Sequence, residues 1–181
     1  MASIRGAVLG MLKLRPMTGY EIKQAYQKGP ANFMQMSFGQ IYPTLTKLGK
    51  EKMVRAGKQP GSRGSIRYFI TSKGEEALRE WLFSAGDLRN HRELLLRLFF
   101  TAPPDLSRLL GAVEAFRREE QARLAHYGET RTWLDTAQAK NSRLLIWKLV
   151  LEYGVLQSEC RVRWAERALA FMTSRNGSKK Q

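Results

Sequence analysis

Three polar pairs with the spacing of a helix N-terminal cap divide the first 80 residues into short helices. A Ser or Thr is followed three residues later by Glu or Gln in the pairs Thr18 and Glu21, Ser37 and Gln40, and Ser72 and Glu75. In such a capping box, each side chain accepts a hydrogen bond from the backbone N–H of the other residue. We therefore predict that three helices begin at these places. Ser3 is expected to cap an earlier, first helix.

Helix-breaking residues set the lengths of these helices. Pro16 ends the first helix, and Gly29 followed by Pro30 ends the second. The third helix is expected to run to about Lys52, and Pro43 predicts an irregular or kinked start, because proline removes a backbone hydrogen bond beyond the first turn. Its buried stripe is predicted to be Ile41, Leu45 and Leu48.

A β-hairpin is predicted next in the chain. Residues 53–58 and 65–70 are β-prone and flank residues 59–64, which are rich in turn formers. A fourth helix follows from Ser72 and ends before Gly86. Three helices, two strands and a helix form the winged version of the helix-turn-helix, so residues 1–83 are predicted to be a winged helix-turn-helix DNA-binding domain. The fold class is mainly α with a small β-hairpin wing.

Residues 84–174 show only helical patterns, with helices expected over about 105–137 and 142–173. The last helix has a coiled-coil-like seam, and further apolar side chains make its stripe wider than one neighbouring helix covers. A second chain would cover the rest, so we predict a helical dimerisation domain and a homodimer. Residues 175–181 are polar and are expected to be a disordered tail. The seam consists of Leu144, Leu151, Ala165 and Met172.

The chain is strongly basic, with 31 Lys and Arg against 16 Asp and Glu and a formal net charge of +15. Residues 1–83 hold 14 of the basic and 5 of the acidic side chains. This excess attracts polyanions, and double-stranded DNA is the expected partner. An anionic membrane would attract the same charge, but no apolar run has the roughly 18–20 residues of a spanning helix, and no signal peptide is evident. Together with the single Cys160, this predicts a cytoplasmic protein.

The predicted DNA contacts lie on the third helix and the hairpin. Amide, hydroxyl and ammonium groups suit base edges and phosphates, whereas an ordinary solvated helix face is the alternative interpretation. Arg63 at the hairpin tip and Arg67 on the returning strand are expected to reach phosphates or the minor groove. The contacts predicted on or beside the third helix are Ser37, Gln40, Tyr42, Thr44, Lys47 and Lys50.

Over residues 4–83 the chain resembles the PadR-like transcriptional regulators. The segments that carry this resemblance are Met17–Ile22 (MTGYEI), Gln40–Leu48 (QIYPTLTKL) and Arg67–Leu78 (RYFITSKGEEAL). Glu93–Phe100 also resembles the start of the family's helical C-terminal domain. The wing run Gly61–Ile66 and Thr18, where the family usually has His, depart from the pattern.

The resemblance implies a winged-helix dimer that usually represses nearby genes and whose C-terminal helices join the subunits. It also implies that Tyr42, Thr44 and Lys47 match positions on the family's DNA-facing helix. Some relatives bind flat aromatic compounds or phenolic acids between subunits. A small aromatic effector near Trp147 and Trp164 is therefore a hypothesis, whereas packing of the core or the dimer is the favoured interpretation of both side chains.

Catalytic chemistry is not indicated. His91, His126 and Cys160 have no metal-site spacing, and no phosphate-binding Gly-rich loop is present. Glu119 and Glu120 are expected to be solvated helix charges, because adjacent residues point to different sides of a helix. We predict no catalytic residue, no metal, no cofactor and no enzymatic activity.

These observations predict a repressor whose third helices enter successive major grooves of a pseudo-palindromic operator and which an aromatic effector releases. Two alternatives stay open: a winged-helix adaptor that docks a protein partner, and an architectural DNA-binding protein without an effector. Steep loss of DNA affinity with salt would distinguish DNA binding from the adaptor.

Overall fold

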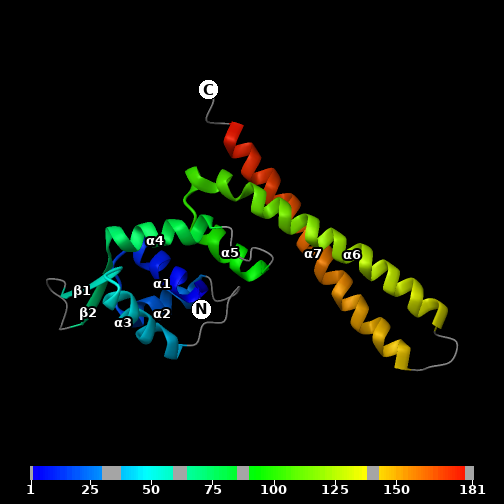
Figure 1. Ribbon diagram of the computed structural model, residues 1–181, viewed down its shortest axis with the longest axis horizontal. Helices are drawn as coiled ribbons and strands as arrows, with labels where there is room; N and C mark the ends of the chain where they lie inside the picture. Colours follow the sequence, from blue (N-terminus) through cyan, green and yellow to red (C-terminus); the bar gives the residue numbers. More distant parts are fainter. Residues whose placement is uncertain (1, 30–37, 59–64, 85–89, 138–142, 178–181) are drawn as a thin grey trace. The chain divides into compact units, whose positions relative to one another are not determined.

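The computed structural model describes residues 2–29, 38–58, 65–84, 90–137 and 143–177 (Figure 1). Two compact units divide the chain, one over residues 1–105 and the other over residues 106–181. Ser37 and Arg63 lie outside the described residues, as do residues 178–181 of the expected tail.

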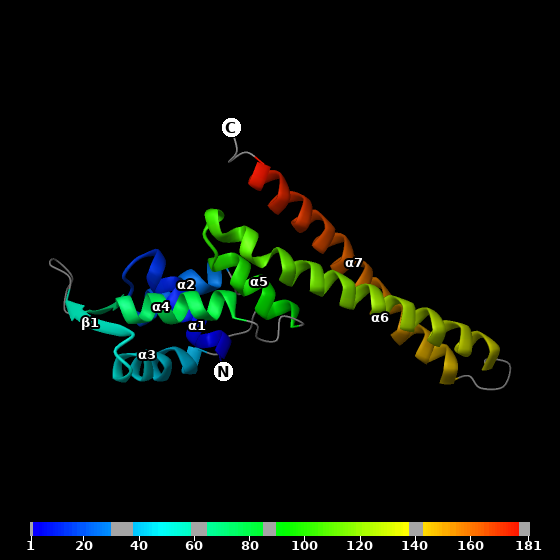
Figure 2. The ribbon, with the colours of Figure 1, turned by 45° about the horizontal axis from the view of Figure 1, so that its top comes forward.

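The first unit has the predicted winged helix-turn-helix order, followed by one further helix (Figures 1 and 2). Its elements are α1 (Ala2–Leu14), α2 (Gly19–Lys28), the 3-10 turn η2 (Phe38–Gln40), α3 (Ile41–Lys50), β1 (Val54–Lys58), β2 (Ile66–Ile70), α4 (Ser72–Phe83) and α5 (His91–Phe100). β1 and β2 pair antiparallel, with Val54 opposite Ile70. Met17 adds a bridge, since its N–H and C=O bond to Tyr68 at 3.2 and 2.8 Å.

The helix starts confirm one capping box and correct two other predictions. At α2, the Thr18 hydroxyl accepts from the Glu21 N–H and the Glu21 carboxylate accepts from the Thr18 N–H, at 3.1 and 2.8 Å. At α4 the cap is Thr71 rather than Ser72, because the Thr71 oxygen accepts from the Gly74 N–H. Ser3 lies inside α1 and therefore does not cap it.

The irregular start of the third helix is confirmed, but Pro43 does not cause it by removing a hydrogen bond. The 3-10 turn η2 precedes α3, and Pro43 is the third residue of α3. The first four N–H groups of an α-helix have no partner within the helix. Proline at this position therefore removes no helical hydrogen bond, and the helix continues through it without interruption.

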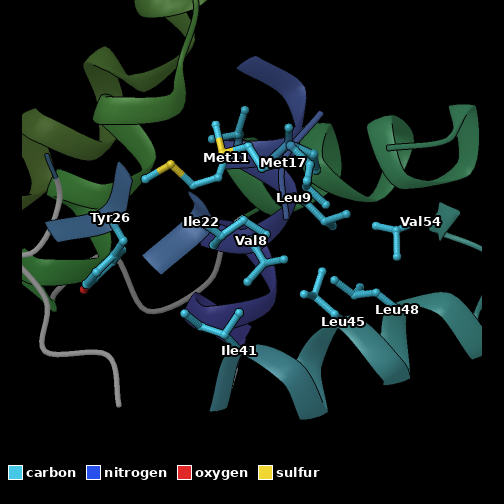
Figure 3. Close-up of a cluster of buried hydrophobic side chains, with 13 residues drawn as sticks. Val8, Leu9, Met11, Met17, Ile22, Tyr26, Ile41, Leu45, Leu48 and Val54 are labelled. Atoms are coloured by element: carbon cyan, nitrogen blue, oxygen red, sulfur yellow. The ribbon is translucent and has the colours of Figure 1, made fainter. Parts of the chain in front are cut away.

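The core of the first unit lies between α1, α2, α3, β1 and α4 (Figure 3). The predicted α3 stripe faces this core, with Ile41, Leu45 and Leu48 at most 1% exposed. Side chains from the other elements complete the cluster: Val8, Leu9, Met11, Leu12, Met17, Ile22, Tyr26, Val54, Leu78 and Leu82.

Two glycines let aromatic rings approach α1 closely. A Cβ atom on Gly6 would lie 2.3 Å from the Trp81 ring of α4, and one on Gly10 would lie 2.5 Å from the Phe100 ring of α5. Both helices consequently pack directly on the α1 backbone, and α5 belongs to the first compact unit. The boundary of the DNA-binding domain at residue 83 stays a prediction.

The second unit consists of α6 (Leu110–Ala137) and α7 (Arg143–Gly177). The two run antiparallel, since Arg131 pairs with Glu152 and Asp135 with Lys148. The start expected near Asp105 is instead the 3-10 helix η3 (Pro103–Leu109). α7 continues through Gly177, three residues into the expected tail.

The predicted seam of α7 packs against α6. Leu144, Ala165 and Met172 are at most 8% exposed, and Leu151 is half-buried. Ser158 occupies the seam position between Leu151 and Ala165, and its hydroxyl donates to Glu120 at 2.8 Å. Glu120 is only 2% exposed, so the prediction that it is a solvated helix charge was wrong.

We predict opposite effects for two Gly→Ala substitutions. A Cβ atom at Gly74 would lie 2.1 Å from the backbone oxygen of Met53, so Gly74→Ala should lower the free energy of unfolding by about 2–3 kcal/mol. Gly49 has open space around its Cβ position, so Gly49→Ala in α3 should raise that free energy by about 0.5–1 kcal/mol. Urea unfolding measures both changes in the free energy of unfolding. If the two substitutions changed it in the same direction, this packing would be contradicted.

Candidate nucleic-acid interface

α3 presents a polar and basic surface on the side opposite its buried stripe. At 100° per residue, Pro43 and Lys47 lie almost directly opposite the buried Leu45. Both are exposed, as are Gln40, Tyr42 and Lys50, whereas Thr44 is half-buried. The structure thus brings five of the predicted contact residues together on the solvent side of one helix. We call Gln40, Tyr42, Pro43, Thr44, Thr46, Lys47 and Lys50 the α3 face.

The N-terminal end of α3 is held close to α2. The Tyr42 ring lies over the backbone of Gly19, the first residue of α2, where a Cβ atom would be 2.6 Å from the ring. A side chain at this position would displace the Tyr42 ring from α2. Tyr42 is nevertheless 58% exposed, so most of its ring stays available to a ligand.

The C-terminal end of α3 is held by an ion pair with α1. Both terminal guanidinium nitrogens of Arg5, Nη1 and Nη2, donate to the carboxylate of Glu51, and the distance from Nη1 to Oε1 is 2.8 Å. The hydrogen bond from Arg5 lowers the pKa of Glu51, and the same bond raises the pKa of Arg5. Glu51 directly follows α3, so the pair fixes the helix on the scaffold at the end opposite Tyr42.

Two open hollows flank the ridge formed by Pro43 and Lys47. One, of about 240 Å³, lies between α1 and α3 and is lined by Ile4, Arg5, Gly39, Gln40, Pro43, Thr44 and Lys47. The other is lined by Tyr42, Pro43, Thr46, Lys47 and Lys50. Sequence reasoning considered Pro43 only as a disturbance of the helix. Its position opposite Leu45 on the helical wheel was the signal that marks it as part of the α3 face.

Arg67 on β2 is engaged inside the first unit. Its Nη1 donates to the carbonyl of Pro16 at 3.0 Å and its Nη2 to Glu21 Oε1 at 2.9 Å. The guanidinium therefore ties the wing to the start of α2, and the side chain is only 20% exposed. A DNA contact by Arg67 stays a prediction, and the geometry supports a positioning role.

Arg55 on β1 is a wing cation that sequence reasoning missed. It stands opposite Phe69 in the strand register, and its guanidinium carbon lies 4.3 Å from the centre of that ring. A cation over an aromatic face is attracted by the ring quadrupole, which orders the exposed side chain. The alternation of β1 around the buried Val54 could have placed Arg55 on the outer face.

The Glu21 carboxylate links the cap of α2 to the wing. The backbone N–H of Thr18 is the main cause that lowers the pKa of Glu21 below its ordinary value of 4.5, and the charge of Arg67 adds to it. Arg15 also lies within 3.5 Å of this carboxylate. The ionised form of Glu21 is thus the form that holds α2 and β2 together.

The two tryptophans proposed for an effector are not brought together within one chain. Trp147 stacks on Trp133, with ring centres 6.4 Å apart, and both rings are more than half exposed. Trp164 packs edge-on against Phe116 at 5.8 Å. At 1.5 Å per residue, Trp147 and Trp164 are about 25 Å apart along α7. An effector site stays a prediction.

The described residues contain no group of three or more His, Cys, Asp or Glu side chains that could hold a metal ion. Among the same residues, no helix is both long enough and apolar enough to cross a membrane.

Family profiles match most of the chain in two parts. The profile described as the transcriptional regulator PadR-like family matches residues 8–80. The profile described as the virulence activator alpha C-terminal domain matches residues 91–173. The first match covers the α3 face and both strands of the wing, and the second begins at α5.

Two named relatives are similar over most of the chain. The negative transcriptional regulator PadR of Bacillus subtilis is 25% identical, over 95% of this chain and 98% of its own. A probable transcriptional regulator of Mycobacterium tuberculosis is 26% identical, over 88% of this chain and 92% of its own.

Solved structures of Bacillus subtilis PadR are also similar. Its complex with operator DNA has a TM-score of 0.40 at 22% identity and covers 93% of this chain and 98% of its own. Its complex with p-coumaric acid has a TM-score of 0.41 at 22% identity and covers 94% and 99%. Both ligands belong to that protein, and the likeness assigns neither to this chain.

We predict that Glu21→Gln destabilises the protein in a pH-dependent way. A carboxyl with a lowered folded-state pKa contributes stability that is present above its unfolded pKa, near 4.5, and is lost as the pH falls through the folded value. The loss in free energy of unfolding should be about 1–2 kcal/mol at pH 7 and should shrink as the pH falls from 6 towards 3. Urea unfolding across that range measures it. The control Glu76→Gln, at an exposed position, should change the free energy of unfolding at pH 7 by less than about 0.5 kcal/mol. A loss in Glu21→Gln that does not depend on pH would refute the stabilising role of the ionised Glu21 carboxylate.

Proposed function

This chain belongs to the PadR-like family of transcriptional regulators, whose profile matches residues 8–80, and from this premise we propose that it represses transcription as a DNA-bound homodimer. The α3 helices of two protomers enter successive major grooves of a pseudo-palindromic operator. Half-sites then lie about one helical turn, or a multiple of it, apart. Repression follows because the bound dimer blocks access of the polymerase.

The observation that carries the proposal is the α3 face on a helix held at both ends. Its amide, hydroxyl and ammonium groups match the donors and acceptors of base edges and phosphates. The contacts of Tyr42 with Gly19 and of Arg5 with Glu51 fix the helix before it meets DNA. A helix held in this way loses little conformational entropy on binding, which favours affinity.

The charge of the chain supports the same partner. A net charge of +15 draws the protein to DNA by counterion release, and that attraction does not depend on base sequence. Lys47 and Lys50 on α3 are exposed, and their ammonium groups suit contacts with phosphates beside a major groove. The exposed Arg55 on β1 extends this positive surface along the wing.

The proposed dimer rests on an apolar surface of α7. Seven large apolar side chains in its N-terminal half are each more than half exposed in the single chain. Soluble monomers rarely expose so large a continuous apolar patch, whereas a second copy would bury it. The exposed side chains are Leu145, Ile146, Trp147, Leu149, Val150, Tyr153 and Leu156.

We predict that two substitutions on the α3 face weaken DNA binding in different ways. Lys47→Ala should lower the affinity for a selected operator about tenfold at 150 mM salt and reduce the slope of log K against log salt by about one, because one phosphate contact is lost. Tyr42→Ala should weaken binding with little change in that slope, because its side chain is uncharged. Fluorescence anisotropy with DNA fragments retained from genomic selection measures both effects.

The control for these variants is Arg79→Ala, which removes an exposed cation from α4. It should leave the affinity within about twofold, since surface cations away from the interface act only through screened, long-range attraction. Normal binding by the Tyr42 and Lys47 variants would refute the α3 face as the reading surface. A parent protein whose DNA affinity did not change with salt would favour the protein-adaptor alternative.

We predict that Val150→Glu disrupts the dimer. The side chain is 65% exposed in the single chain, and the substitution would place an unpaired carboxylate at the proposed interface in both copies. The dissociation constant should rise by at least about a hundredfold, since two buried charges together cost several kcal/mol. Sedimentation at micromolar concentration should give twice 20.7 kDa for the parent and 20.7 kDa for the variant. Gln121→Glu, which adds the same charge at an exposed site on α6, is the control and should stay dimeric.

A further inference from the structure

One position on the solvent side of α3 holds an apolar ring rather than a polar group. Pro43 is exposed and lies opposite the buried Leu45, between residues that can all form hydrogen bonds. It also lines both hollows of the α3 face, together with Lys47. If α3 enters a major groove, Pro43 lies among the first side chains to meet the base edges.

The fold tolerates this proline, and its exposure shows that the described part of the chain does not bury it. As the third residue of α3 it removes no helical hydrogen bond, and its exposed ring adds little to the core. Proline has no side-chain donor or acceptor, so it cannot read a base by hydrogen bonding. An apolar contact is the only recognition that its ring can provide.

The hollow on the α1 side extends this apolar surface. Ile4 of α1 and Pro43 of α3 both line it, and its other lining residues include Arg5, Gln40, Thr44 and Lys47. In the major groove the only apolar group on a base edge is the C5 methyl group of thymine. An open hollow with apolar, polar and cationic lining residues can admit such a methyl group beside the phosphates.

We propose that Pro43, with Ile4 behind it, is a specificity-determining residue that contacts a thymine methyl group in each operator half-site. This inference rests on the proposed DNA binding and adds the identity of one base. Cytosine at that position lacks the methyl group, and its N4 amine would face a ring that offers no acceptor. The operator therefore contains an invariant thymine at the base step that Pro43 contacts.

Deoxyuridine isolates the methyl group, because it differs from thymidine in nothing else. Each thymine of a selected operator is replaced in turn by deoxyuridine, and affinities are measured by fluorescence anisotropy. We expect one thymine in each half-site to respond. Its replacement in one half-site should weaken binding about fourfold, and its replacement in both half-sites should weaken binding about fifteenfold.

Two protein variants assign that effect to its residue. Pro43→Ser keeps a residue that suits the first turn of a helix but removes the apolar ring. It should bind the thymine and deoxyuridine operators equally, whereas Lys50→Ala should lose overall affinity and keep the fourfold preference for thymine. Circular dichroism and urea unfolding establish that Pro43→Ser is folded, and Pro43→Ala provides a second variant with a smaller apolar contact.

The outcomes separate this inference from the function on which it rests. Loss of the thymine preference in Pro43→Ser, with the preference intact in Lys50→Ala, supports the inference. The inference is overturned if the parent binds its operator tightly and no deoxyuridine replacement weakens that binding. It is also overturned if Pro43→Ser keeps the full preference for thymine over deoxyuridine. Either result leaves the proposed repressor function unaffected. Failure of the parent to select any DNA overturns the proposed function itself.

Discussion

The first unit depends on how closely α1 approaches its neighbours. α1 contacts α2, α3, α4, α5 and β2, so it is the shared centre of the unit. Gly6 and Gly10 leave its backbone open to the rings of Trp81 and Phe100. On another side, Arg5 holds the end of α3 through Glu51. The orientation of the α3 face is therefore set by the same helix that carries the core, and a change in the packing of α1 would reach that face directly.

Local sequence signals predicted the elements well because capping and helix periodicity act over four to seven residues. The capping box of Thr18 and Glu21 and the α3 stripe are examples. The cap of α4 was assigned one residue late because Thr71 and Ser72 are equally suitable locally. The tertiary structure decides between them, since the Thr71 hydroxyl also donates to the carbonyl of Lys52 at 2.8 Å.

The site was harder to predict because its partners are far apart in sequence. Arg67 looked like a free wing cation, but its partner Glu21 is 46 residues away and only the folded chain brings them together. Pro43 lies on the solvent side by its spacing from Leu45, but sequence reasoning treated proline as a helix breaker, and only the start of α3 at Ile41 shows that it is tolerated there. Glu120 looked like a surface charge because its partner Ser158 lies on α7, beyond the reach of any helix-periodicity argument.

The bond between Glu120 and Ser158 has a consequence for the symmetry of the proposed dimer. An apolar helix pair whose seam repeats every seven residues could slide by one heptad at little cost. Such a slide would set Leu151 or Ala165 against the buried carboxylate and leave it without the Ser158 hydroxyl, which is unfavourable for a charged group away from water. One alignment of α6 with α7 is thereby preferred over its shifted alternatives. Every copy of the chain then exposes the same pattern of ridges on α7, which two identical molecules need in order to meet about a two-fold axis.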